Sequence, residues 1–348
     1  MTFFVVNNMN KPTDTQIRIF KLFFDEEPLS CETINSSRGD SDFREALIFE
    51  TIDNKYVVKL ADNDFTFPEK IFMWKRTVEE YRKLGYYCPD ILSDRSGSFP
   101  EVSYMSRNCI AYAEEYSKFK PSQERSDDSS ERDPLYESYM NDIWVMTAKI
   151  ADKRFDYTDY PSAYCLFEKF CPSDECDEVL ENALKWIEYA RSLPSVFQKQ
   201  VERIWSLWTE NRNKLEKIYP MLPTSVFQAD LNSTNILLDE NKKFVGVYDF
   251  NLCGKDVFLN YLIRESPYMF EDKINWICNM LKTVSNYYKF SELEKDTVLM
   301  LYRCLVPLWI SCLYKMKELK DNIEDIKLFL DKTEYYLTEV FDFKSFMN

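Results

Sequence analysis

Alternating apolar and polar positions characterise the first third of the chain. Short β-prone runs lie within residues 31–62, where a polar loop at 36–42 separates the first run from the next. Further strand-like runs follow at 101–106 and 109–114. This pattern predicts five strands, beginning as an antiparallel meander.

Two stretches of the same region show helical spacing instead. Residues 12–24 carry apolar side chains about one turn apart, after a candidate N-cap at Thr13 or Asp14. A longer amphipathic helix is expected over 68–84, which Gly85 ends. Strands and helices together predict a small α+β lobe.

Beyond residue 114 the apolar positions mostly follow helical spacing. The exception is 235–250, NILLDENKKFVGVYDF, where two apolar runs flank a polar turn and predict a β-hairpin. Residues 121–133 are rich in Ser, Asp, Glu and Arg and predict a mobile loop or insertion. We therefore expect an α+β protein with a small antiparallel-sheet lobe at 1–113 and a larger, mainly helical lobe at 114–348.

Charge and composition narrow the possible functions. A formal net charge of −15 argues against a nucleic-acid partner, because binding the phosphate backbone requires basic surface. The chain contains no histidine, which removes the usual acyl-transfer triads and the usual zinc sites. Acid–base chemistry must then fall to carboxylates, Lys, Tyr or Cys. The ten scattered cysteines are expected to be reduced and mostly buried.

No segment predicts a membrane association. The longest apolar stretch, 304–314, is interrupted by Pro307 and is much shorter than a bilayer span. The start of the chain lacks a basic region followed by an apolar one. We therefore expect a cytoplasmic protein, most simply a monomer.

One constellation of residues suits phosphoryl transfer. Asp230 precedes Asn235 by five residues, and the predicted hairpin then returns the chain to Asp249. Phosphoryl transfer needs one carboxylate to deprotonate the acceptor hydroxyl, and an amide oxygen with a second carboxylate to hold Mg²⁺. These three residues supply the three groups, although an Asp and an Asn at this spacing also occur in ordinary polar turns.

A nucleotide would need further groups from the first lobe. Strand alternation points Lys59 away from Val58 and Leu60, toward an expected inter-lobe cleft, where it could hold the α- and β-phosphates. The predicted helix offers Glu69, Glu79 and Glu80 to orient this lysine; Glu69 is preferred, although it could equally complement the helix dipole. The phosphate-covering loop is expected at 36–42, with Ser37 and the lone glycine of the loop, Gly39.

Residues 226–265 resemble the catalytic segment of the aminoglycoside phosphotransferase family, which includes choline kinase-like enzymes. The resemblance implies a two-lobed protein-kinase-like fold, Mg²⁺, and ATP or GTP as the phosphoryl donor. It assigns Asp230 as catalytic base, Asn235 and Asp249 as metal ligands, and Lys59 as the nucleotide lysine. It also places the purine at an inter-lobe hinge, Cys109 to Tyr116, whose nucleotide-binding residues would be Glu114, Glu115 and Tyr116.

Two positions depart from the family pattern. Gln228 stands where the family usually has histidine, and Asn260 stands where relatives commonly carry an aspartate that braces the catalytic loop. A nucleotide-binding regulator without turnover, or a nucleotidyl transferase on the same fold, therefore remain alternatives to a kinase.

The acceptor is expected to be a small molecule with a hydroxyl group. Residues 121–190 contain 17 acidic and 7 basic side chains, together with Trp144, Tyr157, Tyr160 and Tyr164. Such a surface would attract an aminoglycoside or another cationic alcohol. The alternative is that the acids are solvated helix faces and the aromatic residues are core.

Overall fold

The structure is a computed structural model that describes residues 10–124, 133–167, 177–265, 273–319 and 322–348. The chain forms two compact units, each described here by itself. The sheet unit comprises residues 1–139 and 230–253, and the helical unit comprises residues 140–229 and 254–348. Most of the loop predicted at 121–133 lies outside the described residues.

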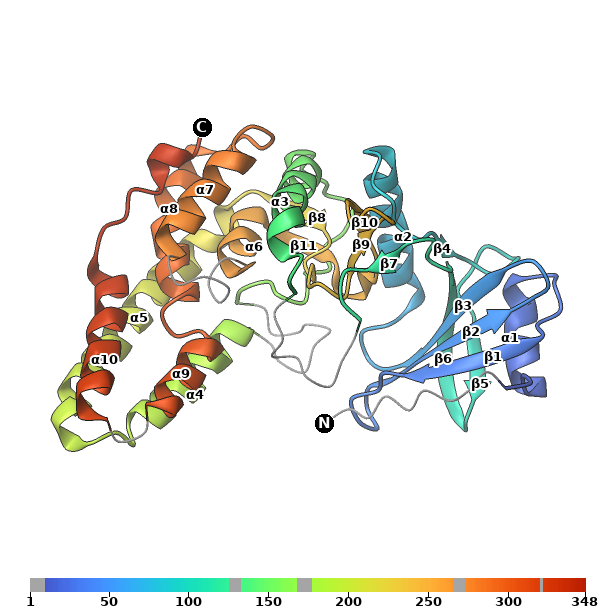
Figure 1. The fold of residues 1–348 in the computed structure, drawn as a ribbon, viewed down its shortest axis with the longest axis horizontal. Coiled ribbons are helices and arrows are strands. Elements are labelled where there is room, and N and C mark those ends of the chain that lie inside the picture. Colours follow the sequence, from blue (N-terminus) through green and yellow to red (C-terminus); the bar gives the residue numbers. More distant parts are fainter. Residues whose placement is uncertain (1–9, 125–132, 168–176, 266–272, 320–321) are drawn as a thin grey trace. The chain divides into compact units, whose positions relative to one another are not determined.

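A six-stranded antiparallel sheet forms the centre of the sheet unit (Figure 1). Its strand order is β1-β2-β3-β6-β4, with β5 paired to β6. The strands are β1 (Ser30–Asn35), β2 (Phe43–Glu50), β3 (Lys55–Asp62), β4 (Ile91–Leu92), β5 (Glu101–Tyr104) and β6 (Arg107–Glu115). The five predicted strands are all present, whereas the two-residue β4 is too short to leave an alternating pattern in the sequence.

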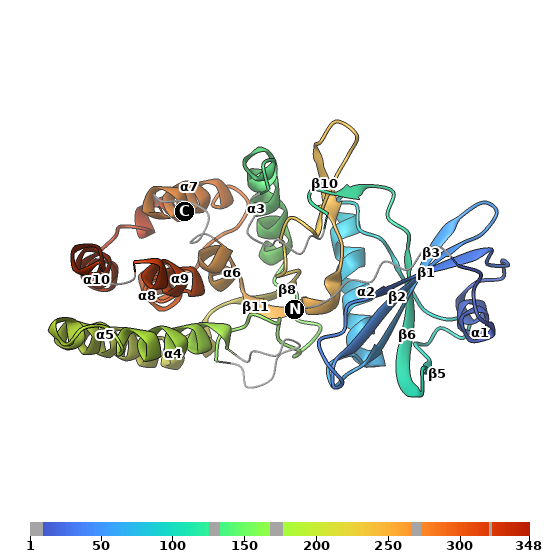
Figure 2. The ribbon, with the colours of Figure 1, turned by 60° about the horizontal axis from the view of Figure 1, so that its bottom comes forward.

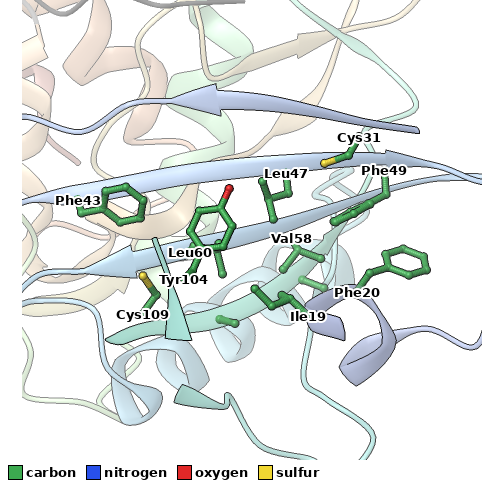
Figure 3. Close-up of a cluster of buried hydrophobic side chains, with 12 residues drawn as sticks. Ile19, Phe20, Cys31, Phe43, Leu47, Phe49, Val58, Leu60, Tyr104 and Cys109 are labelled. Carbon is green, nitrogen blue, oxygen red and sulfur yellow. The ribbon is translucent and has the colours of Figure 1, made fainter. Parts of the chain in front are cut away.

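One face of this sheet packs against helix α1 (Asp14–Phe23). Phe20 of the helix lies among buried side chains of the strands, including Leu47, Phe49 and Val58 (Figure 3). Thr13 begins the helix with a capping box, in which its hydroxyl accepts from the N–H of Gln16. The predicted helix at 12–24 is therefore confirmed.

Helix α2 (Pro68–Lys83) packs on the opposite face. Its Trp74 ring lies 5.9 Å from the Tyr112 ring of β6, edge to face. Tyr81, two turns further along the helix, contacts Phe250 with ring centroids 5.3 Å apart. Pro68 occupies the first turn, where its missing N–H costs no helical hydrogen bond. The predicted helix at 68–84 is confirmed. It packs against the sheet through Trp74 and against Phe250, after the hairpin, through Tyr81.

The predicted hairpin is present as β9 (Ile236–Leu238) and β10 (Phe244–Val247), and β7 (Lys120–Pro121) pairs with β9. The backbone of Tyr87 bonds to β10 on both sides, donating to Val245 at 2.9 Å and accepting from Val247 at 3.0 Å. A Cβ at Gly246 would lie 1.7 Å from the Tyr87 carbonyl oxygen, so only glycine permits this approach.

These contacts explain why the compact units do not follow the predicted division after residue 113. The segment 230–253 is distant in sequence from the first 139 residues, but it packs with them. Close backbone pairing and the ring contact to α2 are long-range interactions, which leave no trace in local hydrophobic periodicity.

The helical unit consists mostly of helices, with a two-stranded sheet of β8 (Thr224–Phe227) and β11 (Gly254–Val257) (Figure 2). Helix α5 packs against α8 and α10, and α4 packs against α5 and α9. The helices are α3 (Tyr136–Asp152), which begins in the sheet unit, α4 (Glu178–Ala190), α5 (Gln198–Ile218), α6 (Phe258–Glu265), α7 (Lys273–Val284), α8 (Glu292–Leu305), α9 (Ile310–Glu318) and α10 (Ile323–Thr338).

One stretch of the described residues, Glu292–Glu318, has the length and apolar composition of a membrane span. It is broken between α8 and α9 around Pro307, and 61% of its most apolar window is buried within the protein. This is the pattern of a core segment. The eight described cysteines are free thiols, and five of them are buried.

Candidate active site

Lys59 lies on the face of the sheet opposite the core cluster. Its neighbours Val58 and Leu60 are buried in that cluster, so strand alternation directs the lysine to the α2 face. Lys59 is the direct cross-strand partner of Tyr112 on β6, and Glu114 lies two residues further along β6 on the same face. The register therefore brings a lysine, a tyrosine and a glutamate together.

Two carboxylates hold the ammonium group of Lys59. Its Nζ lies 3.0 Å from Glu114 Oε1 and 3.0 Å from Asp249 Oδ1, and all three side chains are largely buried. Burial disfavours the charged lysine, but the carboxylates of Asp249 and Glu114 outweigh it and hold the pKa of Lys59 well above its usual value. Burial raises the pKa of Glu114, against the opposing effect of Lys59.

Asp249 occupies an unusual backbone conformation. Its φ of 61° and ψ of 65° are left-handed, a region that residues other than glycine enter at a cost of about 1–3 kcal/mol. A short 3₁₀ helix, η3 (Phe250–Leu252), follows directly, and Phe250 is anchored against Tyr81 of α2. The aspartate is thus held in a fixed orientation at the end of the hairpin.

The loop from Asp230 to Asn235 is closed by its own side chains. Asn235 Nδ2 donates to the Asp230 carbonyl at 2.9 Å and to Asp230 Oδ2 at 3.0 Å. Asn232 Nδ2 donates to the other carboxylate oxygen at 2.9 Å. The N–H of Tyr248 donates to the Asn235 carbonyl at 3.1 Å, which ties this loop to the residue before Asp249.

The amide oxygen of Asn235 stands out in this loop. Asn235 is 1% exposed, and its buried Oδ1 accepts no hydrogen bond from any residue that the structure describes. An unpartnered buried acceptor is costly unless a ligand satisfies it. Among the described residues no group of three or more Cys, Asp or Glu side chains could hold a metal ion. The oxygens of Asn235 and Asp249 nevertheless fit Mg²⁺, which prefers oxygen donors and usually takes few from the protein.

Glu69, Ser37 and Gly39 are three of the residues predicted to orient Lys59 or to cover the phosphates. Glu69 belongs to the first turn of α2, and the described carboxylates that pair with Lys59 are Glu114 and Asp249, so the predicted Lys59–Glu69 pair does not form. The Ser37 hydroxyl accepts from the N–H of Arg44 at 3.0 Å. Gly39 adopts a φ of 125° in the same loop. The hydroxyl of Ser37 therefore closes the β1–β2 loop.

The segment predicted as a hinge is largely strand. Residues 107–115 form β6, which pairs with β3, β4 and β5. Its alternate residues Cys109, Ala111 and Ala113 are buried in the core cluster. Glu115 accepts from Arg82 at 2.9 Å and from the N–H of Asp90 at 3.1 Å. Although burial raises its pKa, these bonds lower it overall. Tyr116 is 43% exposed and has Lys55 Nζ 5.7 Å from its ring centroid.

The two departures from the family pattern lie in the helical unit. Gln228 is fully buried directly after β8. Asn260 Nδ2 donates to the Tyr164 carbonyl at 3.1 Å and to both Asp256 oxygens at 3.3 Å. Sequence reasoning missed Asp256, which lies in β11 two residues before α6 begins, where no helical spacing relates it to Asn260.

The predicted acidic and aromatic acceptor surface is only partly available. Trp144 is 3% exposed and packs on Trp276 with ring centroids 4.8 Å apart, so it is core. The Tyr164 ring is covered by the Arg264 guanidinium at 3.6 Å. The more accessible aromatic residue is Tyr160, which is 36% exposed.

Comparison with known proteins gives the fold. No protein-family model and no curated protein matches the chain. A solved structure of a microcompartment-associated aminopropanol kinase is 13% identical, with a TM-score of 0.52 over 92% of this chain and 94% of that chain. A spectinomycin phosphotransferase in complex with ADP and spectinomycin is 10% identical, with a TM-score of 0.47 over 97% of this chain and 98% of that chain.

A solved amicoumacin kinase is 14% identical, with a TM-score of 0.49 over 96% of this chain and 97% of that chain. Identities this low establish fold alone, and the aminopropanol kinase is the comparison that carries it. The predicted α+β, two-lobed protein-kinase-like fold is therefore confirmed. The resemblance to small-molecule kinases, expected from residues 226–265, holds at the level of the fold.

Proposed function

We propose that the protein is a small-molecule kinase that transfers the γ-phosphoryl group of ATP or GTP to a hydroxyl group. One observation carries this proposal: an unbroken series of contacts runs through the candidate site. Lys59 pairs with Asp249, the preceding Tyr248 bonds to Asn235, and Asn235 bonds to Asp230. These are the cation, carboxylates and amide that phosphoryl transfer requires.

Each group in this series has a proposed task. Lys59, whose charge is maintained by its neighbours, binds the α- and β-phosphates of the nucleotide. Asp230 orients the acceptor hydroxyl and removes its proton as the acceptor oxygen bonds to the γ-phosphorus and the bond from that phosphorus to the β–γ bridging oxygen breaks, which releases ADP or GDP. The Asn235 amide fixes one carboxylate oxygen of Asp230 at 3.0 Å, which holds this base in a defined orientation.

Asn235 Oδ1 and the Asp249 carboxylate would hold Mg²⁺. The unpartnered Asn235 oxygen supports this assignment, because a bound cation would satisfy it. Bound Mg²⁺ would neutralise charge on the nucleotide phosphates. The left-handed backbone at Asp249 sets the direction of its Cα–Cβ bond, and the ion pair with Lys59 at 3.0 Å orients its carboxylate.

The acceptor is proposed to be a cationic alcohol. The net charge of −15 favours the approach of cations over anions. By its name, the aminopropanol kinase of the same fold acts on an amino alcohol. We further propose a cytoplasmic monomer without nucleic-acid or membrane partners.

The test is acceptor-stimulated release of ADP or GDP with Mg²⁺ over a panel of aminoglycosides and simple amino alcohols. Asp230→Ala is expected to lower kcat about 10²- to 10⁴-fold, the usual contribution of a general base. Asp53→Ala, in an exposed turn of the same unit, is the matched control and should behave as wild type. Pyrophosphate as the product would instead indicate a nucleotidyl transferase, and nucleotide binding without release a regulator.

A further inference from the structure

Among the described residues, Lys59 forms no ion pair with a carboxylate of α2. Glu79 pairs with Lys75 at 3.9 Å, and Glu80 pairs with Lys83 at 2.8 Å, in both cases within the helix. Glu69, in the first turn, is likewise absent from the ion pairs of Lys59 described above. Toward the sheet this helix presents Trp74, whose ring contacts Tyr112. A helix carboxylate therefore does not orient this lysine.

A strand carboxylate takes that position instead. Glu114 lies on β6, where its backbone is paired on one side with Val57 of β3 and on the other with Ile91 of β4. Lys59 and Glu114 are diagonal neighbours on one face of the sheet, a spacing that long side chains can bridge. Their contact of 3.0 Å is thus fixed by strand register.

We infer that Glu114 is the positioning residue for Lys59, holding the lysine in place when Asp249 is engaged with a metal ion and the nucleotide. This inference rests on the proposed function, because it takes Lys59 as the lysine that binds phosphate. It differs from the hinge role that the sequence resemblance assigned to Glu114. Glu114 acts through the lysine and does not touch the purine.

The reason lies in the two partners of the lysine. Without ligands Lys59 is shared between Asp249 and Glu114 at equal distances. A metal ion at Asp249 would compete with Lys59 for that carboxylate, and Glu114 would then be the remaining anchor of the ammonium group. Since both residues belong to paired central strands, the direction of the lysine depends on sheet register and does not depend on movement of α2.

The test is a double-mutant cycle read out as the Kd of Mg²⁺–ADP by titration calorimetry. The variants are Glu114→Gln, Lys59→Met and the two combined. Glu114→Gln is expected to weaken binding about tenfold, a size typical of coupled neighbours, and to have almost no effect once Lys59 is already methionine. Glu101→Gln, an exposed glutamate on neighbouring β5, is the matched control and should bind as wild type.

Each other result overturns the inference. A full effect of Glu114→Gln in the Lys59→Met background would mean direct contact with the nucleotide, and unchanged or tighter binding in Glu114→Gln would mean no positioning role. If Glu69→Gln weakened Mg²⁺–ADP binding as much as Glu114→Gln, the carboxylate that orients Lys59 would come from α2 instead. If Glu114→Gln does not fold, Glu114→Asp, which keeps the charge on a shorter side chain, must weaken binding. Wild-type protein that binds no nucleotide would overturn the proposed function itself.

Discussion

Asp249 and Asp256 are seven residues apart, yet their surroundings differ completely. Asp249 faces a lysine at 3.0 Å from a left-handed backbone position. Asp256 is 1% exposed in the helical unit, and its donors among the described residues are all neutral. These are the Ser162 hydroxyl at 2.8 Å, the Tyr219 hydroxyl at 3.0 Å, the N–H of Val257 at 2.7 Å and the Asn260 amide at 3.3 Å.

The difference separates a carboxylate that can exchange partners from one that serves as an anchor. Neutral donors oriented by folded backbone give Asp256 no charged partner to exchange, and its bonds join residues far apart in sequence. Asp249 shares its lysine with Glu114, so the ion pair can rearrange without leaving the lysine unpaired. We therefore expect substitutions at Asp249 to change activity, and substitutions around Asp256 to change stability.

The largest effect is expected for Asp249→Asn. Asparagine tolerates the left-handed conformation and keeps the shape of the side chain, so the fold should be retained. Loss of the charge weakens a proposed metal ligand, and kcat should fall about 10³-fold, as for removal of a key electrostatic group. The measurement is Mg²⁺-dependent ADP release beside thermal unfolding. If the variant loses stability but keeps its kcat, Asp249 has a structural role like that of Asp256.

Part of this comparison could be predicted from sequence. The five-residue spacing and the hairpin placed Asn235, Asp230 and Asp249 in one local segment, and local segments are where periodicity and turn signals are informative. The Lys59–Glu114 pair was missed because it depends on the register between β3 and β6, which hydrophobic alternation alone does not determine.

The Asp256 network was missed for a related reason. Its donors come from residues 162, 219 and 260, which only the folded chain brings together. Burial of an aspartate is rare unless it is paired, so composition favours the surface for such a residue. The prediction of the acceptor surface made the opposite error, because it counted the buried Trp144 as exposed. The sequence alone does not distinguish a buried tryptophan from an exposed one.

A smaller effect, on stability, is expected for Asp256→Asn. The amide would bring an N–H₂ group into a site built from donors, leaving buried groups unsatisfied, and the free energy of unfolding should fall by about 2–3 kcal/mol. Urea unfolding measures this change. The matched control is Asp142→Asn, an exposed aspartate on α3 in the same unit, which should unfold as wild type. Turnover per folded molecule should stay close to wild type, and a collapse of kcat at unchanged stability would contradict the anchor role.

The smallest effect, and the one that depends on pH, is expected for Asn260→Asp. The substitution replaces a donor that lies 3.3 Å from both Asp256 oxygens with a second carboxylate. Burial already raises the pKa of Asp256, although its hydrogen bonds oppose this, and a like charge would raise the pKa of the pair further. A carboxyl group whose pKa is higher in the folded state than in the unfolded state favours folding when it is protonated. The loss of stability relative to wild type should therefore be small near pH 4 and grow to about 1–2 kcal/mol as pH rises through the folded-state pKa.

Unfolding in urea at several pH values between 4 and 8 measures this loss of stability. The control is Asn279→Asp on the exposed face of α7, for which the difference from wild type should not depend on pH in this way. A deficit of the same size at every pH would show that the two carboxyl groups do not share a proton, and that the lost hydrogen bond to the Tyr164 carbonyl is the whole effect.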